Sequence, residues 1–90
     1  MTPDRIQAIR QRLQAALNPE FLEVEDESHL HVGHAGARDG RGHYKVTVVT
    51  AAFSGQSRLV RHRLVYAALG SMMETDVHAL TIQAMAPEDV

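Results

Sequence analysis

The feature that most constrains the fold is a change of hydrophobic period in the second half of the chain. Residues 43–50 alternate polar and apolar side chains, which is typical of a strand. Residues 57–73 follow the 3.6-residue period of a helix, and residues 77–84 alternate again. The apolar face of this helix consists of Val60, Leu64, Val65, Ala68, Leu69 and Met72. A helix of roughly four turns is long enough for a right-handed crossover, so we expect the two flanking strands to be parallel.

The first half of the chain predicts one helix and one further strand. Apolar residues between Thr2 and Leu17 follow the helical period, and Asn18-Pro19 ends the helix. Residues Phe21–Asp26 alternate, as a half-exposed strand does, and the simplest pairing with the next strand is antiparallel. The sequence therefore predicts an α+β fold of order α-β-β-α-β. We expect a three-stranded mixed sheet packed by helices, in a single domain over residues 1–90.

Composition excludes several classes of protein. The 90 residues contain no cysteine, so the chain has no disulfide framework, no thiolate nucleophile and no all-cysteine metal site of its own. The formal net charge is −2 with histidine neutral, which argues against a broad surface for nucleic acid. No apolar run approaches the ~18 residues of a membrane span, and the N-terminal residues lack the apolar core of a secretory signal. We therefore expect a cytoplasmic protein without a membrane segment.

Histidines concentrate in the segment Glu27–Tyr44, whose glycines predict a loop between the first two strands. Four of the six histidines of the chain lie there: His29, His31, His34 and His43. Because the second and third strands are predicted to be parallel, this loop and the start of the third strand share one edge of the sheet. His78 stands at that start, whereas His62 falls toward the opposite end, at the beginning of the crossover helix.

Two interpretations of these histidines follow from the pattern. Imidazoles that converge from separate elements on one exposed rim are suitable ligands for a borderline-soft metal ion. Alternatively, the loop histidines are solvated surface residues. On this alternative, His78, which shares strand parity with Leu80 and Ile82, packs its ring against the core.

Three segments resemble the BolA family in order and spacing: GHYKVTVVTAAFSG, RHRLVYAAL and VHALTIQAMAPE. The resemblance extends from the first helix to Pro87. It implies a mixed three-stranded sheet with helices, like the class II variant of the KH domain, which agrees with the topology predicted above. It also implies a partner, because BolA-like proteins pair with monothiol glutaredoxins and share a [2Fe–2S] cluster with them, to which the glutaredoxin brings glutathione.

The resemblance also implies the residues that hold the cluster. The family ligand that opens the last strand corresponds to His78, and the second ligand lies in the loop between the first two strands. His31 matches that loop position best, and His34, three residues further on, is the alternative. His29 and His43 receive no ligand role. The loop ends in ARDGRG, where the family often has a shorter ending, and this departure leaves the choice between the two loop histidines open.

Two functions are in competition. The resemblance implies a non-enzymatic glutaredoxin partner in iron–sulfur cluster trafficking or iron regulation, on its own a monomer or weak homodimer. The alternative is a KH-like DNA-binding transcriptional regulator, with weak DNA contact through Arg58, Arg61 and Arg63. Against that alternative, residues 54–57 do not form the GxxG loop with which KH domains clamp a nucleic-acid backbone. We expect no enzyme activity, because no carboxylate is placed to orient a histidine beside a nucleophile.

Overall fold

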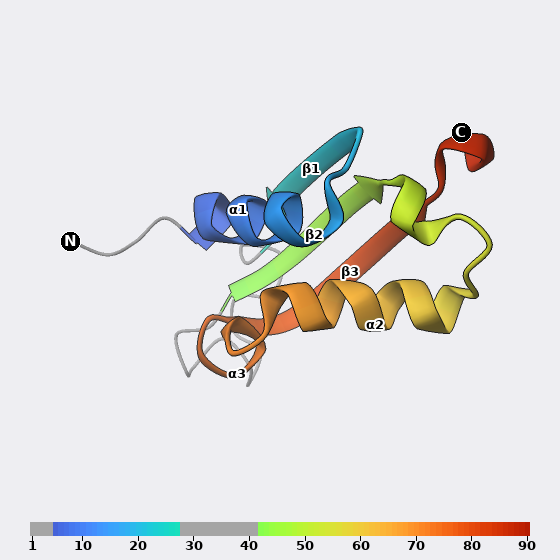
Figure 1. The fold of residues 1–90 in the computed structure, drawn as a ribbon. Helices are drawn as coiled ribbons and strands as arrows, with labels where there is room; N and C mark the ends of the chain where they lie inside the picture. The colour runs from blue at the N-terminus through green and yellow to red at the C-terminus, as the bar shows by residue number, and fades with distance from the viewer. Residues whose placement is uncertain (1–4, 28–41) are drawn as a thin grey trace.

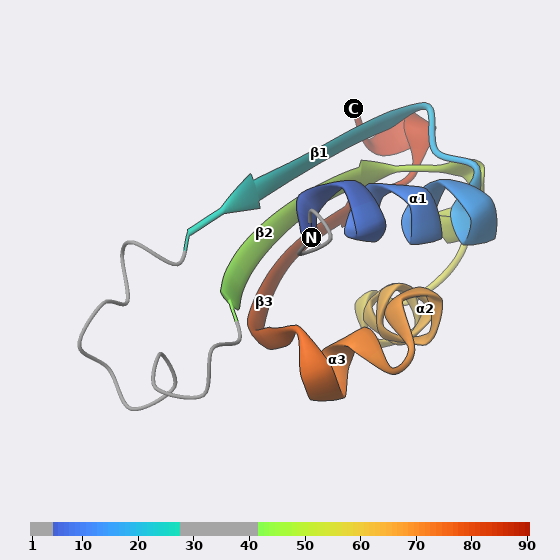
Figure 2. The same cartoon turned by 90° about the vertical axis from the view of Figure 1, so that its left-hand side faces the viewer.

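The computed structural model describes residues 5–27 and 42–90, which form two layers: a three-stranded sheet and helices on one of its faces (Figures 1 and 2). The strands are β1 (Phe21–Asp26), β2 (Gly42–Val49) and β3 (Val77–Met85), in the spatial order β1-β2-β3. β1 pairs with β2 antiparallel, and β2 pairs with β3 parallel. The predicted α+β class and mixed sheet are therefore confirmed.

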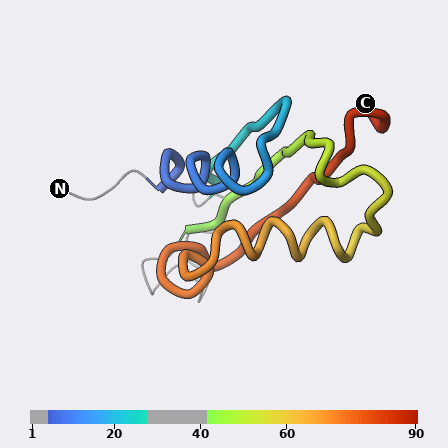
Figure 3. The backbone as a smooth tube through the Cα atoms, viewed as in Figure 1, coloured from blue at the N-terminus to red at the C-terminus, as the bar shows by residue number. Residues whose placement is uncertain are grey.

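The helices are α1 (Arg5–Leu17), α2 (Arg58–Leu69) and α3 (Met72–Thr75), with short 3₁₀ turns η3 (Ala51–Phe53) and η4 (Pro87–Asp89). The crossover from β2 through η3 and α2 to β3 can be followed in Figure 3. No helix in the described part of the chain is both long and apolar enough to cross a membrane. The predicted domain limits, residues 1–90, stay a prediction.

One core lies between the sheet and the helices, and its residues confirm the predicted periodicities. α1 buries Ile9 and Leu13, and β2 buries Val46 and Val48, all fully. Phe53 in η3 is also fully buried and anchors the turn that leads into α2. The remaining buried members are Leu17, Tyr44, Val65, Leu69, Met72, Val77, Ile82 and Ala86. The opposite face of the sheet carries no described helix (Figure 2).

The predicted crossover helix is one segment from residue 57 to residue 73, whereas the structure divides it. α2 begins after the N-cap Ser57 and ends at Leu69, because Gly70 has φ 54° and ψ −126°. This backbone conformation suits glycine and ends the helical hydrogen-bond pattern. The short α3 follows and buries Met72, so the apolar face continues although the helix does not.

Candidate functional site

The start of β3 contains a register shift that determines where His78 lies. Gly42 of β2 pairs with Val77, but the next residue, His43, pairs with Ala79, so His78 is the additional residue of a β-bulge. Val77 is fully buried, whereas His78 is exposed. The interpretation that strand parity packs the His78 ring against the core is therefore wrong, because strict alternation fails at the bulge.

His43 lies against His78. The two ring centroids are 5.1 Å apart, with the ring planes tilted by 52°. The His43 residue is only 8% exposed, so its ring is a buried support and the His78 ring is the accessible one. This contact confirms that the start of β2 and the start of β3 share one edge of the sheet. The prediction that His43 is not a ligand stays a prediction.

Backbone and aromatic contacts fix this corner of the sheet. The Gly42 N–H donates to the Asp76 carbonyl at 2.9 Å, and the Glu27 N–H donates to the His43 carbonyl at 2.8 Å. The Tyr44 ring packs over Gly42 so closely that a Cβ at residue 42 would lie 2.5 Å from Tyr44 Cε2. Burial raises the pKa of the Tyr44 hydroxyl, although a hydrogen bond with Arg5 opposes the rise in part. The histidine pair therefore stands on a tightly packed frame.

The loop histidines His29, His31 and His34 lie outside the described residues. Glu27 and Gly42 are the described residues on either side of this segment, and the contacts above place both at the corner that carries His78. Within residues 5–27 and 42–90, no three histidine or carboxylate side chains come together as a metal site. A site with three or more such ligands around His78 would therefore need ligands from outside the described part of the chain.

The three arginines in the first turns of α2, Arg58, Arg61 and Arg63, are of two kinds. Arg61 donates to the Gln56 carbonyl at 3.0 Å, to the Ala84 carbonyl at 3.1 Å and to Asp89 Oδ2 at 2.8 Å. Its side chain is 17% exposed, so Arg61 is a structural tie and not a cation held out to solvent. Arg58 and Arg63 are exposed.

The sequence did not predict the partner of Arg61. Asp89 is 28 residues away from Arg61, in a short polar segment after the last strand, and no periodic pattern connects the two residues. The Ala86 N–H also donates to Asp89 Oδ2 at 2.9 Å, and these two bonds lower the pKa of the Asp89 carboxyl, the Ala86 bond most. We call the contacts of Arg61 with Ala84 and Asp89, together with that of Asp89 with Ala86, the arginine clasp.

Comparisons with known proteins agree with this fold. Residues 13–89 match the family described as BolA-like protein. The chain is 50% identical over 80 residues to BolA-like protein 1 of Bos taurus, which covers 89% of this chain and 57% of that protein. It is 43% identical over 74 residues to the DNA-binding transcriptional regulator BolA of Escherichia coli (strain K12), covering 82% of this chain and 68% of that one.

The solved structure of the BolA domain of SufE1 from Arabidopsis thaliana matches with a TM-score of 0.86 and 38% identity, over 100% of both chains. The first curated relatives are longer than this chain, which spans 24% and 57% of their lengths. The family match, the identities and the shared topology of helices and mixed sheet lead to one conclusion. This chain belongs to the BolA family.

Proposed function

We propose that this chain is a cytoplasmic, non-enzymatic partner of a monothiol glutaredoxin and shares a [2Fe–2S] cluster with it. His78 holds one iron together with one loop histidine, His31 or His34, and the glutaredoxin supplies the other ligands with glutathione. The role is cluster trafficking or iron regulation. The observation that supports the proposal is the exposed His78 ring on a β-bulge, at the corner where the histidine-rich segment joins the sheet.

The donor set of the chain fits this group. Histidine nitrogen is an accepted ligand of a [2Fe–2S] cluster, as in Rieske centres, where two histidines replace two cysteines on one iron and raise the reduction potential. The chain has six histidines and no cysteine, so any thiolates must come from the partner. A cluster that belongs to two proteins must be reached from outside, and the His78 ring is exposed.

The residues around His78 orient its ring. The ring of the buried residue His43 lies against it, with the two ring centroids 5.1 Å apart. The bulge is fixed on both sides, by Val77 in the core and by the pairing of Ala79 with His43. Since less ordering is needed on binding, a ligand on such a frame binds more tightly than one on a free loop.

The experiment is co-expression with a monothiol glutaredoxin, followed by visible absorption and circular dichroism of the purified complex. We expect a cluster spectrum in the native pair and its loss in His78→Ala. His62→Ala is the matched control, because this histidine lies in α2 at the far end of β3 and should keep the spectrum. An unchanged spectrum in His78→Ala would contradict the proposal.

The same assay assigns the loop ligand. His31→Ala and His34→Ala are compared singly and together, and we expect the larger loss in His31→Ala with partial rescue by His34. If all three loop variants kept the spectrum of the native pair, the loop histidines would be removed from the proposal, and His43 would be tested next.

A second candidate is DNA binding, which the name of the E. coli relative favours. Arg58 and Arg63 are exposed, but Arg61 is engaged by Asp89, and the net charge is −2. Binding through so few phosphate contacts should be weak and independent of sequence. A salt titration between roughly 50 and 300 mM decides, because sequence-selective DNA binding that survives the upper end, without any cluster in the glutaredoxin complex, would favour the regulator.

A further inference from the structure

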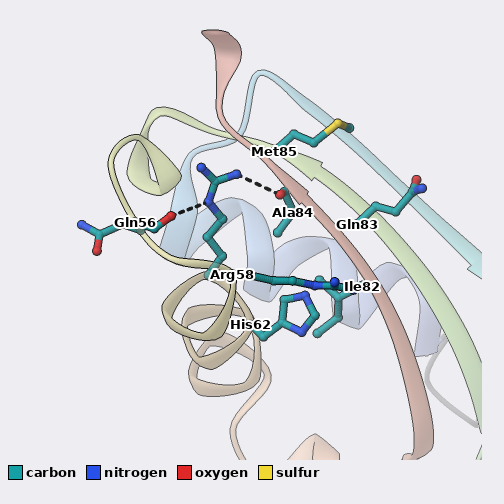
Figure 4. Close-up of a pocket in the computed structure, with 8 residues that line it drawn as sticks. Gln56, Arg58, His62, Ile82, Gln83, Ala84 and Met85 are labelled. Atoms are coloured by element: carbon teal, nitrogen blue, oxygen red, sulfur yellow. Dashed lines mark hydrogen bonds between the residues drawn. The ribbon is translucent and has the colours of Figure 1, made fainter. Parts of the chain in front are cut away.

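A groove of about 410 Å³ lies between the start of α2 and the second half of β3 (Figure 4). It is separate from the histidine corner, since Ile82 follows His78 by four residues of strand, roughly 13 Å at ~3.3 Å per residue. The wall toward α2 consists of Gln56, Arg58, Arg61 and His62. The wall toward the sheet consists of Ile82, Gln83, Ala84 and Met85.

The sheet wall of this groove is a strand edge. β3 is an outer strand in the order β1-β2-β3, so it has a neighbour on one side only. In parallel pairing, residues that bond to the neighbouring strand alternate with residues whose main-chain groups point away from it. The Met85 carbonyl accepts from the Thr50 N–H after β2, so the main-chain groups of Ile82 and Ala84 point away from β2.

Arg61 closes one end of this edge and leaves the rest open. Its Nη1 donates to the Ala84 carbonyl at 3.1 Å, so this carbonyl on the outer edge of β3 already has a hydrogen-bond partner. The N–H groups of Ile82 and Ala84 and the Ile82 carbonyl therefore remain for another strand. Unpaired edge groups of this kind are what peptides use when they add a strand to a sheet.

The charge of the groove selects the kind of peptide. No carboxylate is among the residues that line it, whereas Arg58 extends toward Ile82 beside the His62 ring (Figure 4). The charge of Arg61 is already balanced by Asp89 at 2.8 Å. One exposed guanidinium beside an imidazole matches a single carboxylate, which arginine binds through paired charge-assisted hydrogen bonds. A nucleic-acid strand would need several such cations to hold successive phosphates.

We propose that this groove binds an extended acidic peptide segment of another protein. The peptide pairs with Ile82 and Ala84 on the outer edge of β3, and one of its carboxylates meets Arg58. The groove does not include the histidine corner, so this binding does not depend on the glutaredoxin partnership.

The probe is a synthetic octapeptide of alternating valine and glutamate, titrated into ¹⁵N-labelled protein to about 1 mM, where even weak complexes form. We expect the largest amide shifts at Ile82 and Ala84, with His78 and its neighbours unaffected. The matched glutamine peptide should bind about tenfold more weakly, because it loses the carboxylate contact. The glutamate peptide N-methylated on the amides of one edge should bind as weakly as the glutamine peptide, because it cannot pair with the strand.

Protein variants test the same contacts from the other side. Arg58→Gln should weaken the glutamate peptide about tenfold and leave the glutamine peptide unchanged. Arg63→Gln is the matched control on the same helix, exposed but outside the groove, and should leave both peptides unchanged. Shifts away from Ile82 and Ala84, no binding at all, or equal binding of the two peptides would overturn the proposal. A single-stranded oligonucleotide that moved the same amides at lower concentration would overturn it in favour of nucleic acid.

Discussion

The two ends of β3 use polar side chains in opposite ways. At its start, the bulge buries Val77 and leaves the adjacent His78 exposed. At its end, the Ala84 carbonyl accepts from Arg61, and the N–H of Ala86, just beyond the strand, donates to Asp89. The start therefore leaves a histidine side chain exposed, whereas at the end Arg61 and Asp89 are paired within the fold and Arg58 stays exposed. The sequence places three arginines close together, but only the structure separates the one that ties the fold together from the two that are exposed.

The largest expected effect contrasts the two neighbours at the bulge. Val77→Ala should lower the free energy of unfolding by about 2 kcal/mol, because it removes two buried methyl groups and leaves a cavity. His78→Ala should change it by no more than about 0.5 kcal/mol, because the residue is exposed. Urea unfolding of both variants measures the difference. Equal losses would show that His78 supports the core, and the contrast between the two ends of the strand would fail.

A smaller effect is expected at the arginine clasp. Arg61→Ala should lower the free energy of unfolding by about 1–2 kcal/mol, because two main-chain carbonyls and Asp89 lose a charged donor. Arg58→Ala, on the same helix and exposed, is the matched control and should stay within about 0.5 kcal/mol. If both variants have the same free energy of unfolding, the clasp contributes nothing to stability, and Arg61 behaves like the exposed Arg58.

Periodicity predicted the parts of the fold that depend on which face of an element is apolar. The burial of Val46 and Val48 in β2, and of Ile9 and Leu13 in α1, follows directly from spacings of two and of three to four residues. The strand order followed as well, because a helix between two strands leaves few topologies. These features are local patterns combined with one general rule, which is why the sequence was sufficient.

Other features depend on single backbone angles or on contacts between residues far apart in the sequence, and neither can be inferred from periodicity. The end of α2 depends on the positive φ of Gly70, and the exposure of His78 depends on a register shift against His43, a residue 35 positions earlier. A distant pair of the same kind joins the helices, since Arg12 Nη1 donates to the Leu69 carbonyl at 2.8 Å and ties α1 to the end of α2. The choice between His31 and His34 stays open because both lie outside the described residues.

A third effect concerns alkaline pH and belongs to the histidine corner. Burial raises the pKa of the Tyr44 hydroxyl above its ordinary value of 10.0, so the folded protein favours the neutral form. The unfolded chain ionises first, and the stability that this residue contributes is lost as pH rises from about 10 through the folded pKa. Unfolding measured from pH 8 to about 11 should show a steeper loss in the native protein than in Tyr44→Phe. Tyr66→Phe, which removes a hydroxyl at an exposed position, is the matched control.

The smallest effect lies at the opposite end of the pH scale and at the opposite end of β3. The Ala86 N–H and the Arg61 guanidinium hold the pKa of the Asp89 carboxyl below its ordinary value of 3.8. The folded state therefore favours the charged form. The stability that results is present above the unfolded pKa and is lost as pH falls through the folded pKa. Because the Asp89 side chain is exposed, this contribution is screened and should be smaller than that of the Arg61 bonds to main-chain carbonyls. Asp89→Asn should reduce the loss of stability between about pH 2 and 4. Glu20→Gln, at an exposed position outside the clasp, is the matched control. Identical acid slopes in the native protein and in Asp89→Asn would mean that the clasp is held by Arg61 and Ala84 alone, with Asp89 as a bystander.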